Sequence, residues 1–497
     1  MAFKTAEFDQ LVERLMEEWH VPGLSIAVVQ GDQIDAKAYG YAKFPHEECT
    51  TETIFDLASV SKCTTAAAAA LLVDDDKYPD MQWQTPVSKL IPEDFVLPTQ
   101  SLTEQVTLED ILSHRSGIPT HDESYMGVTA ARPDDARSLT RNLRNLAFAA
   151  PLRTKLLYSN IMFSVATHVV ETVSGEDYTS FLHSRLWGPL GMHNTYQDRP
   201  DVRPSARAAQ GHRWDDTAQT YVPVPILASP EGRGAGCVLT SAGDYARFVR
   251  CLVNKAAPLS EAAHGALVQP RTIDMVDAED VLPGGEDVAL YALGLYRYTY
   301  RGNTVMKHAG AVPGFRTAMA FLPGKKWGVV ICTNSNPGEH VHAILENVLV
   351  DEVLGVREDE RTDWEKVFKE ISARYDEEDR KDKEKPEFTV PEDPEPLGVA
   401  IQGLAGRYYN KGYKELRLEM KEGKVVADCT DRCFPFVVTF EHLSGKRFVA
   451  DMHDLWDDFH FFKKAAVKVD GEGKVVAVGV HFETDLEELI WFDRIED

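Results

Sequence analysis

The stretch FDLASVSKCTTAAAAALLVDDD, residues 55–76, places Ser59 and Lys62 three positions apart at the start of an alanine-rich run. Such a run predicts a buried helix, and a helix brings positions i and i+3 onto one face. Burial drives a lysine toward its neutral form, and a neutral amine can take the proton of a serine hydroxyl. We therefore interpret Ser59 as a nucleophile, helped by helix N-terminal N–H groups that favour an oxyanion.

A purely structural interpretation of this pair is that Ser59 is an ordinary N-cap with a lysine nearby. Two details favour chemistry over capping. The chain contains no second Ser-x-x-Lys, and the pair opens the most strongly helical run in the sequence.

Two further fragments carry residues of the same kind. LLYSNIMFSVATHVVE, residues 156–171, places Tyr158 and Asn160 just ahead of a helix, and MKHAGAVPGF, residues 306–315, places His308 before an apolar hairpin. Each is weak alone, because Tyr158 could be a packed aromatic residue and His308 a surface strand residue. Their order and their flanking sequences make the set specific.

The set resembles the serine β-lactamase and penicillin-binding-protein superfamily, in particular its class C-like branch of esterases, D-aminopeptidases and acyltransferases. The resemblance covers about residues 8–355 and rests on three motifs in order: Ser59-Val-Ser-Lys62, Tyr158-Ser-Asn160 and His308-Ala-Gly310. VPGLSIAVV, TLEDILSHRSGIP and GRGAGCVLTSAGDYARFV match the branch as well. The last hundred residues resemble the lipocalin-like barrel appended to some members.

The resemblance implies catalytic roles for the first two motifs. Ser59 would be the nucleophile, and Lys62 would be its general base or the group that lowers its barrier. Tyr158 would protonate the leaving group and later activate water. Asn160 would orient the substrate or Lys62.

The third motif implies electrostatic support and an oxyanion hole. His308 stands where many relatives have the lysine of Lys-Thr-Gly, which favours support of Tyr158 or of an acyl oxygen over carboxylate recognition. The oxyanion hole would consist of the backbone N–H groups of Ser59 and Ala311.

The expected fold class is α+β, with three parts along the chain. GLSIAVVQ predicts a strand near the start of residues 1–355, and RTAMAFLPGKKWGVVICTNSN predicts a Pro-Gly hairpin near their end. With helices at both ends as well, we expect an antiparallel sheet flanked by helices. The resemblance implies an all-helical subdomain beside this sheet. Residues 356–398 are mostly charged and Pro-rich, so we expect a charged helix and a linker that packs on neither neighbour. Alternating strands and tight turns over residues 399–497 predict a small antiparallel barrel.

Composition limits the partners. The 497-residue chain has a net charge of -26, which argues against nucleic acid, and its apolar runs are too short for a membrane span. Seven scattered cysteines, no signal peptide and no glycosylation sequon favour a cytoplasmic protein. We expect a small-molecule acyl substrate and no cofactor or metal. An alternative role of the barrel is to form a homo-oligomer through the edges of its strands.

These observations predict a serine acyl hydrolase that works through a Ser59 acyl-enzyme on an ester, amide or lactone. An esterase comes first, followed by a D-specific peptidase and an acyltransferase of the same fold. The rival from another class is a binding or scaffold protein that kept the fold and lost the chemistry, with the barrel carrying the ligand.

Overall fold

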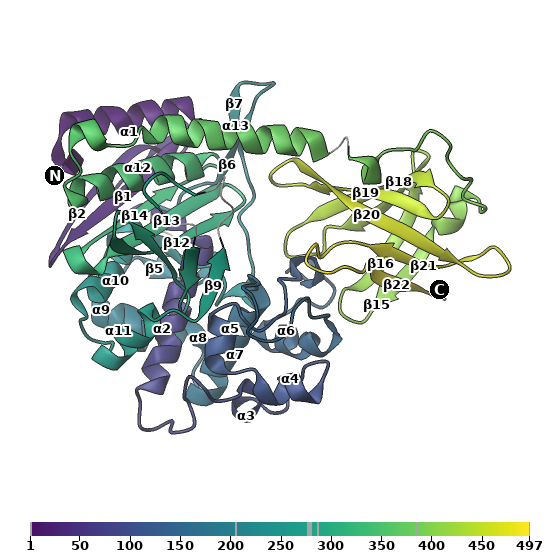
Figure 1. Ribbon diagram of the computed structural model, residues 1–497, viewed down its shortest axis with the longest axis horizontal. Coiled ribbons are helices and arrows are strands. Elements are labelled where there is room, and N and C mark those ends of the chain that lie inside the picture. Colours follow the sequence, from purple (N-terminus) through teal and green to yellow (C-terminus); the bar gives the residue numbers. More distant parts are fainter. Residues whose placement is uncertain (1, 204–205, 276–280, 286–287, 383–384, 497) are drawn as a thin grey trace.

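The computed structural model of the protein describes residues 2–496, apart from 204–205, 276–280, 286–287 and 383–384. A large domain of helices and strands is followed by one long helix and a closed C-terminal barrel (Figure 1). This architecture confirms the expected α+β fold class. Within these described ranges, every helix is too short or too polar to cross a membrane.

A nine-stranded antiparallel sheet forms the centre of the large domain. The strand predicted from GLSIAVVQ is present as β1, and the predicted Pro-Gly hairpin is present as β13 and β14. Because β1 pairs with β14 from Leu24 to Gln30, the two ends of the domain meet in one sheet. Across the sheet the strands are β3 (Glu47–Glu48), β2 (Gln33–Lys43), β1 (Gly23–Gln30), β14 (Trp327–Thr333), β13 (Phe315–Leu322), β12 (Asn303–Val312), β11 (Tyr296–Tyr300), β10 (Val288–Tyr291) and β9 (Thr272–Met275).

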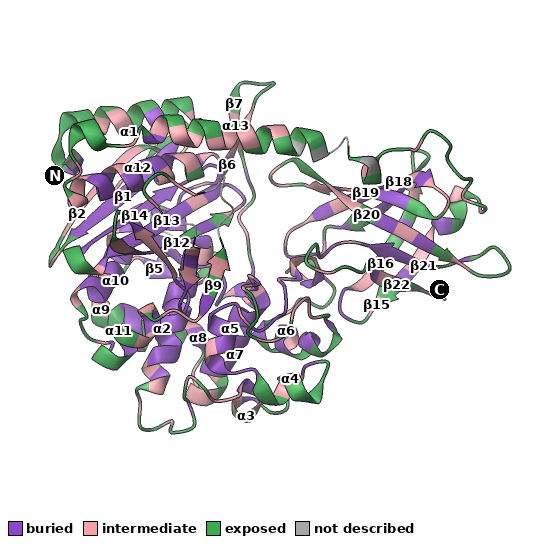
Figure 2. Cartoon of the chain, viewed as in Figure 1, coloured by how far each residue is buried: buried purple, intermediate pink, exposed green. Residues whose placement is uncertain are grey.

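Helices cover both faces of this sheet. Successive residues of β1 point to opposite faces, so Ile26 joins the apolar cluster formed with α1 (Ala6–Glu18) and α12 (Gly338–Leu354). Its neighbour Ala27 joins the larger cluster on the other face, which includes α10 (Ala242–Asn254). Figure 2 shows the strands buried between helices whose outer surfaces are exposed.

Short helices form a second lobe beside the sheet, as the resemblance implied. The alanine-rich run becomes α2, which is buried along almost its whole length, and it packs against α7. The lobe contains α2 (Lys62–Val73), α3 (Val87–Leu90), α4 (Gln100–Gln105), α5 (Leu108–Leu112), α6 (Ala136–Asn142), α7 (Asn160–Ser174), α8 (Tyr178–Leu182), α9 (Gly188–Leu190) and α11 (Glu261–Val268). Small strands nearby are β4 (Ile54–Asp56), β5 (Thr195–Tyr196), β8 (Leu239–Ser241), and the hairpin β6 (His212–Asp215) and β7 (Thr220–Pro223).

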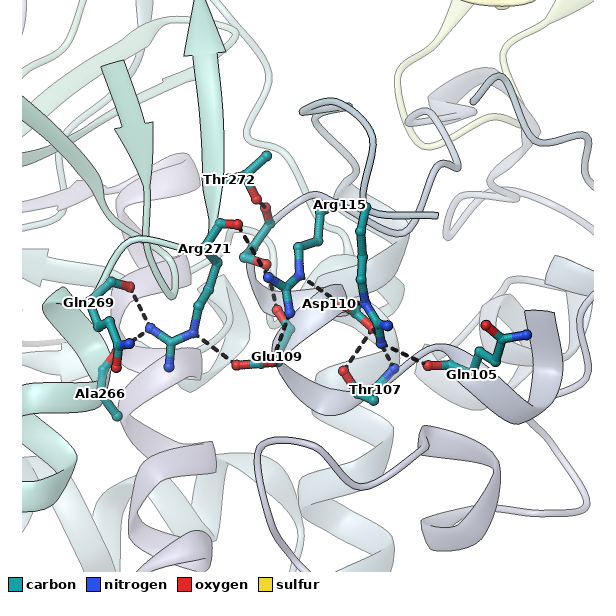
Figure 3. A network of polar contacts seen from close by, with 11 residues as sticks. Gln105, Thr107, Glu109, Asp110, Arg115, Ala266, Gln269, Arg271 and Thr272 are labelled. Carbon is teal, nitrogen blue, oxygen red and sulfur yellow. Dashed lines mark hydrogen bonds and ion pairs between the residues drawn. The ribbon is translucent and has the colours of Figure 1, made fainter. Parts of the chain in front are cut away.

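A buried polar network fixes α5 to the sheet (Figure 3). Thr107 and Asp110 form a capping box at the start of α5. The fully buried Asp110 also accepts hydrogen bonds from Arg115, at 2.6 Å, and from Arg153, at 2.7 Å. Arg271, the residue before β9, donates to Glu109 at 2.9 Å. The segment between α5 and α7, which lines the candidate site, is therefore held from several directions.

The charged segment after the large domain packs more tightly than its composition predicts. Helix α13 (Trp364–Asp382) lies along α12, and its first residue, Trp364, is only 2% exposed. The Trp364 indole donates to Asp351 at 2.8 Å. The expectation that this segment packs on neither neighbour is therefore wrong. Trp364, Val367 and Phe368 supply an apolar stripe that charge counting ignores, and Leu397 packs against the cluster that includes the barrel core.

The C-terminal strands close into a barrel, which confirms the predicted barrel. Buried apolar side chains such as Leu418, Val438 and Phe492 belong to one cluster with the core of the large domain. Since β15 pairs with β22, each barrel strand has a neighbour on both sides, but residues 459–463 of β20 pair only with β19. Self-association through this edge stays a prediction. The strands are β15 (Gly406–Asn410), β16 (Lys414–Lys421), β17 (Lys424–Cys429), β18 (Phe436–Ser444), β19 (Arg447–Asp454), β20 (Phe459–Val469), β21 (Val475–Val480) and β22 (Ile490–Ile495).

Candidate active site

Ser59 lies in a tight turn between the sheet and α2. The sequence places it in the first turn of an α-helix, but it belongs to the 3-10 turn Ala58–Ser61, and α2 begins at Lys62. Ala58 has a left-handed backbone (φ 46°), which is uncommon for a residue with a Cβ. Ser59 is therefore not an N-cap, yet the turn still brings residues three apart together, and the Ser59 side chain stays partly exposed.

Lys62 is completely buried and makes three short polar contacts. Its Nζ lies 2.9 Å from Ser59 Oγ, 2.8 Å from Asn160 Oδ1 and 2.7 Å from the Ala235 carbonyl oxygen. Burial lowers the pKa of Lys62 from 10.5 to about 7, although the nearby carboxylate of Asp122 opposes this shift. A large fraction of Lys62 is thus neutral at neutral pH.

The contacts of Lys62 fix where its lone pair points. A neutral amine has two N–H donors, and the Asn160 and Ala235 oxygens can only accept. Both donors are therefore engaged, and the lone pair is left for the Ser59 hydroxyl. The titratable groups facing Lys62 are Asp122, Cys63, Cys237, His114, His308 and, with its ring centroid 4.9 Å from Nζ, Tyr158.

Tyr158 sits over Lys62 and contacts Ser59 through a side-chain hydrogen bond. Burial raises the pKa of Tyr158 far above its usual range, and the hydrogen bond with Ser59 only partly offsets this. The phenol therefore keeps its proton. His114 packs beneath it, with ring centroids 4.2 Å apart, and accepts a hydrogen bond from the Ser159 N–H at 3.0 Å.

Asn160 begins α7 and is held between a lysine and a carboxylate. Its Nδ2 donates to Asp122 at 3.0 and 3.2 Å, while its Oδ1 accepts from Lys62. Because a carboxylate accepts and an ammonium or amine donates, only one orientation of the Asn160 amide satisfies both partners. Burial raises the pKa of Asp122, whose hydrogen bonds with Thr120 and Asn160 oppose that shift.

Strand β12 passes directly beside the Ser59 turn. A Cβ added at Gly310 would meet the Leu57 carbonyl oxygen at 2.2 Å and the Ser59 nitrogen at 3.0 Å, so only glycine fits there. The next residue, Ala311, is exposed. It lies opposite Arg316, one position from the Val312 and Phe315 pair that flanks a two-residue hairpin loop. By the alternation of antiparallel pairs, the Ala311 N–H points away from β13.

His308 is buried on the same strand and is neutral. Burial, followed by the charge of Lys62, lowers its pKa to about 3. Its Nδ1 lies 2.6 Å from the Ala309 carbonyl oxygen and must donate to it, so Nε2 accepts from the Tyr291 hydroxyl at 3.2 Å. Its ring centroid lies 6.4 Å from that of Tyr158. A neutral imidazole does not supply the positive charge of a lysine.

The structure thus brings all six sequence-predicted residues to one place, on the α2 turn, α7 and β12. The sequence analysis missed the carbonyl of Ala235 and the carboxylate of Asp122, which complete the Lys62 environment. It also missed His114 and Tyr291. His114 occurs in the matched SHRSG signature, which could have marked it, whereas nothing local marks Tyr291 or the Ala235 carbonyl.

Comparison with known proteins agrees with this geometry. The Beta-lactamase family profile matches residues 8–351. The chain belongs to the Beta-lactamase family. It is 32% identical to the unguisins hydrolase of Aspergillus campestris, over 99% of this chain and 92% of that protein, and 26% identical to penicillin-binding protein 4 of Amycolatopsis lactamdurans, over 83% and 99%. The octameric penicillin-binding protein homologue from Pyrococcus abyssi shares its fold, with a TM-score of 0.62, 20% identity and coverage of 98% and 100%.

A wide cleft is lined by residues of the Beta-lactamase domain, of α13 and of the barrel. Its volume is 1490 Å³, and its wall includes Arg316, the cross-strand partner of Ala311. Aromatic side chains line both sides, among them Trp214 from β6 and Phe459 and Phe461 from β20. Among the residues that the structure describes, no three His, Cys, Asp or Glu side chains form a group suited to a metal ion.

Proposed function

We propose that this Beta-lactamase family member is a serine acyl hydrolase that works through an acyl-enzyme on Ser59. The observation that carries the proposal is the environment of Lys62. A buried lysine whose pKa lies near 7, and whose two N–H donors are engaged by Asn160 and Ala235, offers its lone pair to Ser59. A scaffold protein has no need to keep a lysine buried in this state.

The acylation step follows from these positions. Lys62 takes the Ser59 proton as Oγ forms a bond to the substrate carbonyl carbon, and the carbonyl π electrons move onto oxygen. The N–H groups of Ser59 and Ala311 would stabilise that oxyanion. When it collapses, the bond to the leaving group breaks, and the leaving atom receives a proton from Tyr158, which regains one from Lys62.

Deacylation repeats the step with water as the nucleophile. Lys62 accepts a proton from water while the oxygen attacks the acyl carbon, and Lys62 gives that proton to Ser59 Oγ as the bond between Oγ and the acyl carbon breaks. The raised pKa of Tyr158 supports a role as proton donor and relay, and leaves proton uptake to Lys62. The neutral His308, bonded to Tyr291, supports a role in holding this wall of the site.

For the substrate, we infer an amide or ester in a molecule larger than a simple alkyl ester. Ser59, Lys62 and Tyr158 do not line the cleft of 1490 Å³, but Arg316, the cross-strand partner of Ala311, does. A substrate that extends past Ala311 could therefore place further groups in it. The chain is similar over nearly its whole length to a protein named for hydrolysing unguisins, which supports a substrate related to unguisins. This inference places large amides and large esters ahead of the simple esters that the sequence analysis placed first.

Labelling with a fluorophosphonate tests the nucleophile. The wild-type protein should gain one adduct by intact mass, and peptide mapping should place it on Ser59. The Ser59→Ala variant should stay unlabelled while keeping the wild-type circular dichroism spectrum and unfolding midpoint. An unlabelled wild-type protein, or an adduct on another serine, would refute the proposed function.

A substrate series tests the size inference. We expect Phe461→Ala to raise KM for amides of several residues and to leave kcat/KM for p-nitrophenyl acetate unchanged, because only the larger molecules reach the cleft. Val476→Ala, at another exposed apolar position of the barrel, is the matched control. Equal effects on both substrates would argue against the cleft as part of the substrate site.

A further inference from the structure

We propose that the barrel is a working part of the catalytic centre: it fixes the loop whose Asp122 orients Asn160 against Lys62. The inference rests on the proposed serine acyl hydrolase function and extends it to residues far along the chain. Tyr413 and Glu483 of the barrel would be positioning residues. The loop concerned, residues 120–129, is called the docking loop below.

The docking loop is joined to the barrel by backbone hydrogen bonds. The Cys433 N–H donates to the Tyr125 carbonyl at 3.0 Å, and the Gly127 N–H donates to the Asp431 carbonyl at 2.9 Å. Between them, Met126 and Arg432 form an antiparallel bridge. This is a short strand pairing between the two domains. Its register fixes where the loop lies on the barrel.

His121 is the second attachment, and it lies next to Asp122. It is completely buried and has a left-handed backbone (φ 51°), so its surroundings hold it in an uncommon conformation. Its N–H donates to Glu483 at 2.9 Å. Its Nε2 lies 2.9 Å from the Ala147 carbonyl oxygen and must donate, so Nδ1 accepts from the Tyr413 hydroxyl at 2.7 Å.

Asp122 connects the docking loop to Lys62 through the side chain of Asn160. Asn160 Nδ2 donates to Asp122 at 3.0 Å, and Lys62 Nζ donates to Asn160 Oδ1 at 2.8 Å. These two hydrogen bonds join the loop to Nζ. If Asp122 moved away, the Asn160 amide could turn its NH₂ group toward Lys62. The amine would then lose an acceptor, and its lone pair would no longer be confined to the direction of Ser59.

The test uses full-length variants and the rate of fluorophosphonate labelling of Ser59 as a function of pH. Tyr413→Phe removes the hydroxyl that donates to His121, and labelling should slow about tenfold or more. The limb that reports the Lys62 titration should move to lower pH, because a displaced Asp122 no longer raises the pKa of Lys62. If Tyr413 had a purely structural role, Tyr413→Phe would lower the folded fraction and leave the pH of this limb unchanged.

The matched control is Tyr408→Phe, which removes an equally buried barrel hydroxyl that donates to Leu404 at 2.7 Å, inside the barrel. Its labelling rate should stay within about twofold of wild type, as for sites away from the chemistry. Glu483→Gln keeps an acceptor for the His121 N–H and should label normally, whereas Glu483→Ala should label slowly. If Tyr413→Phe does not fold, the comparison of Glu483→Gln with Glu483→Ala tests whether the barrel positions His121 and the docking loop.

Two results overturn the inference. One is wild-type labelling rate and pH limb in both Tyr413→Phe and Glu483→Ala. The other is equal slowing in Tyr408→Phe, which would indicate a general loss of barrel stability. Neither touches the proposed function, which fails only if the wild-type protein itself is not labelled on Ser59.

Discussion

At the residue scale, the titration of Lys62 determines when the site can work. Burial lowers its pKa from 10.5 to about 7, so the neutral amine predominates above that pH. We expect kcat/KM for an activated ester to rise with pH through one limb near this value and then level off. The Glu123 carboxyl also has a pKa raised by burial to about 7, so Glu123→Gln is the control. A limb that disappears in this variant would belong to Glu123.

Gly310 is the second residue whose identity the packing dictates. We expect Gly310→Ala to reduce acylation of Ser59 by about 100-fold or more, because the new methyl group would push β12 away from the Ser59 N–H and misalign an oxyanion donor. Stopped-flow measurement of the acylation rate checks this. Gly324→Ala, where nothing lies within 4 Å of the added Cβ, should react like wild type. Similar rates in both variants would contradict the assigned oxyanion hole.

At the element scale, the Asp110 network holds α5 and the segment that follows it. Burial raises the pKa of Asp110, but bonds from Arg153 and Thr107 outweigh this and leave it lowered, so its contribution persists above the usual carboxyl pKa and is lost at lower pH. We expect Asp110→Ala to lower the free energy of unfolding by about 3 kcal/mol, measured by urea denaturation at pH 7. Glu360→Gln, which breaks only an exposed pair with Arg357, should change it by less than about 0.5 kcal/mol. Similar losses would show that the network adds no stability.

At the scale of the whole molecule, the barrel is held by contacts as well as by the chain. Residues 389–400 form neither helix nor strand, so limited proteolysis should cut there, as the charged composition predicts. The structure adds that the two pieces should then co-elute in gel filtration and still label Ser59, because the docking loop and the shared apolar core hold the barrel. Separation of folded pieces that label equally well would contradict this.

Local patterns were enough to predict much of the fold. The apolar runs and turn residues predicted β1, the β13 and β14 hairpin and the barrel, because hydrophobic periodicity is set by neighbours in the sequence. The charged helix expected after residue 355 is present as α13, but its packing was not predicted, because three apolar side chains in this charged segment contact the cluster around α12. Composition measures the average of a segment, whereas packing depends on which face carries the few apolar residues.

For the site, the sequence by itself determined the reactive groups: the spacing of Ser59 and Lys62 fixes their proximity in any tight helical turn. Only the tertiary structure decided their chemical state. The two acceptors that direct its lone pair, Asn160 and Ala235, lie 98 and 173 residues further along the chain. The burial that lowers the pKa of Lys62 likewise comes from the packing of distant segments around it. The same holds for Asp122 and the barrel residues behind it. Desolvation and hydrogen-bond direction depend on long-range packing, which no local pattern of residues encodes.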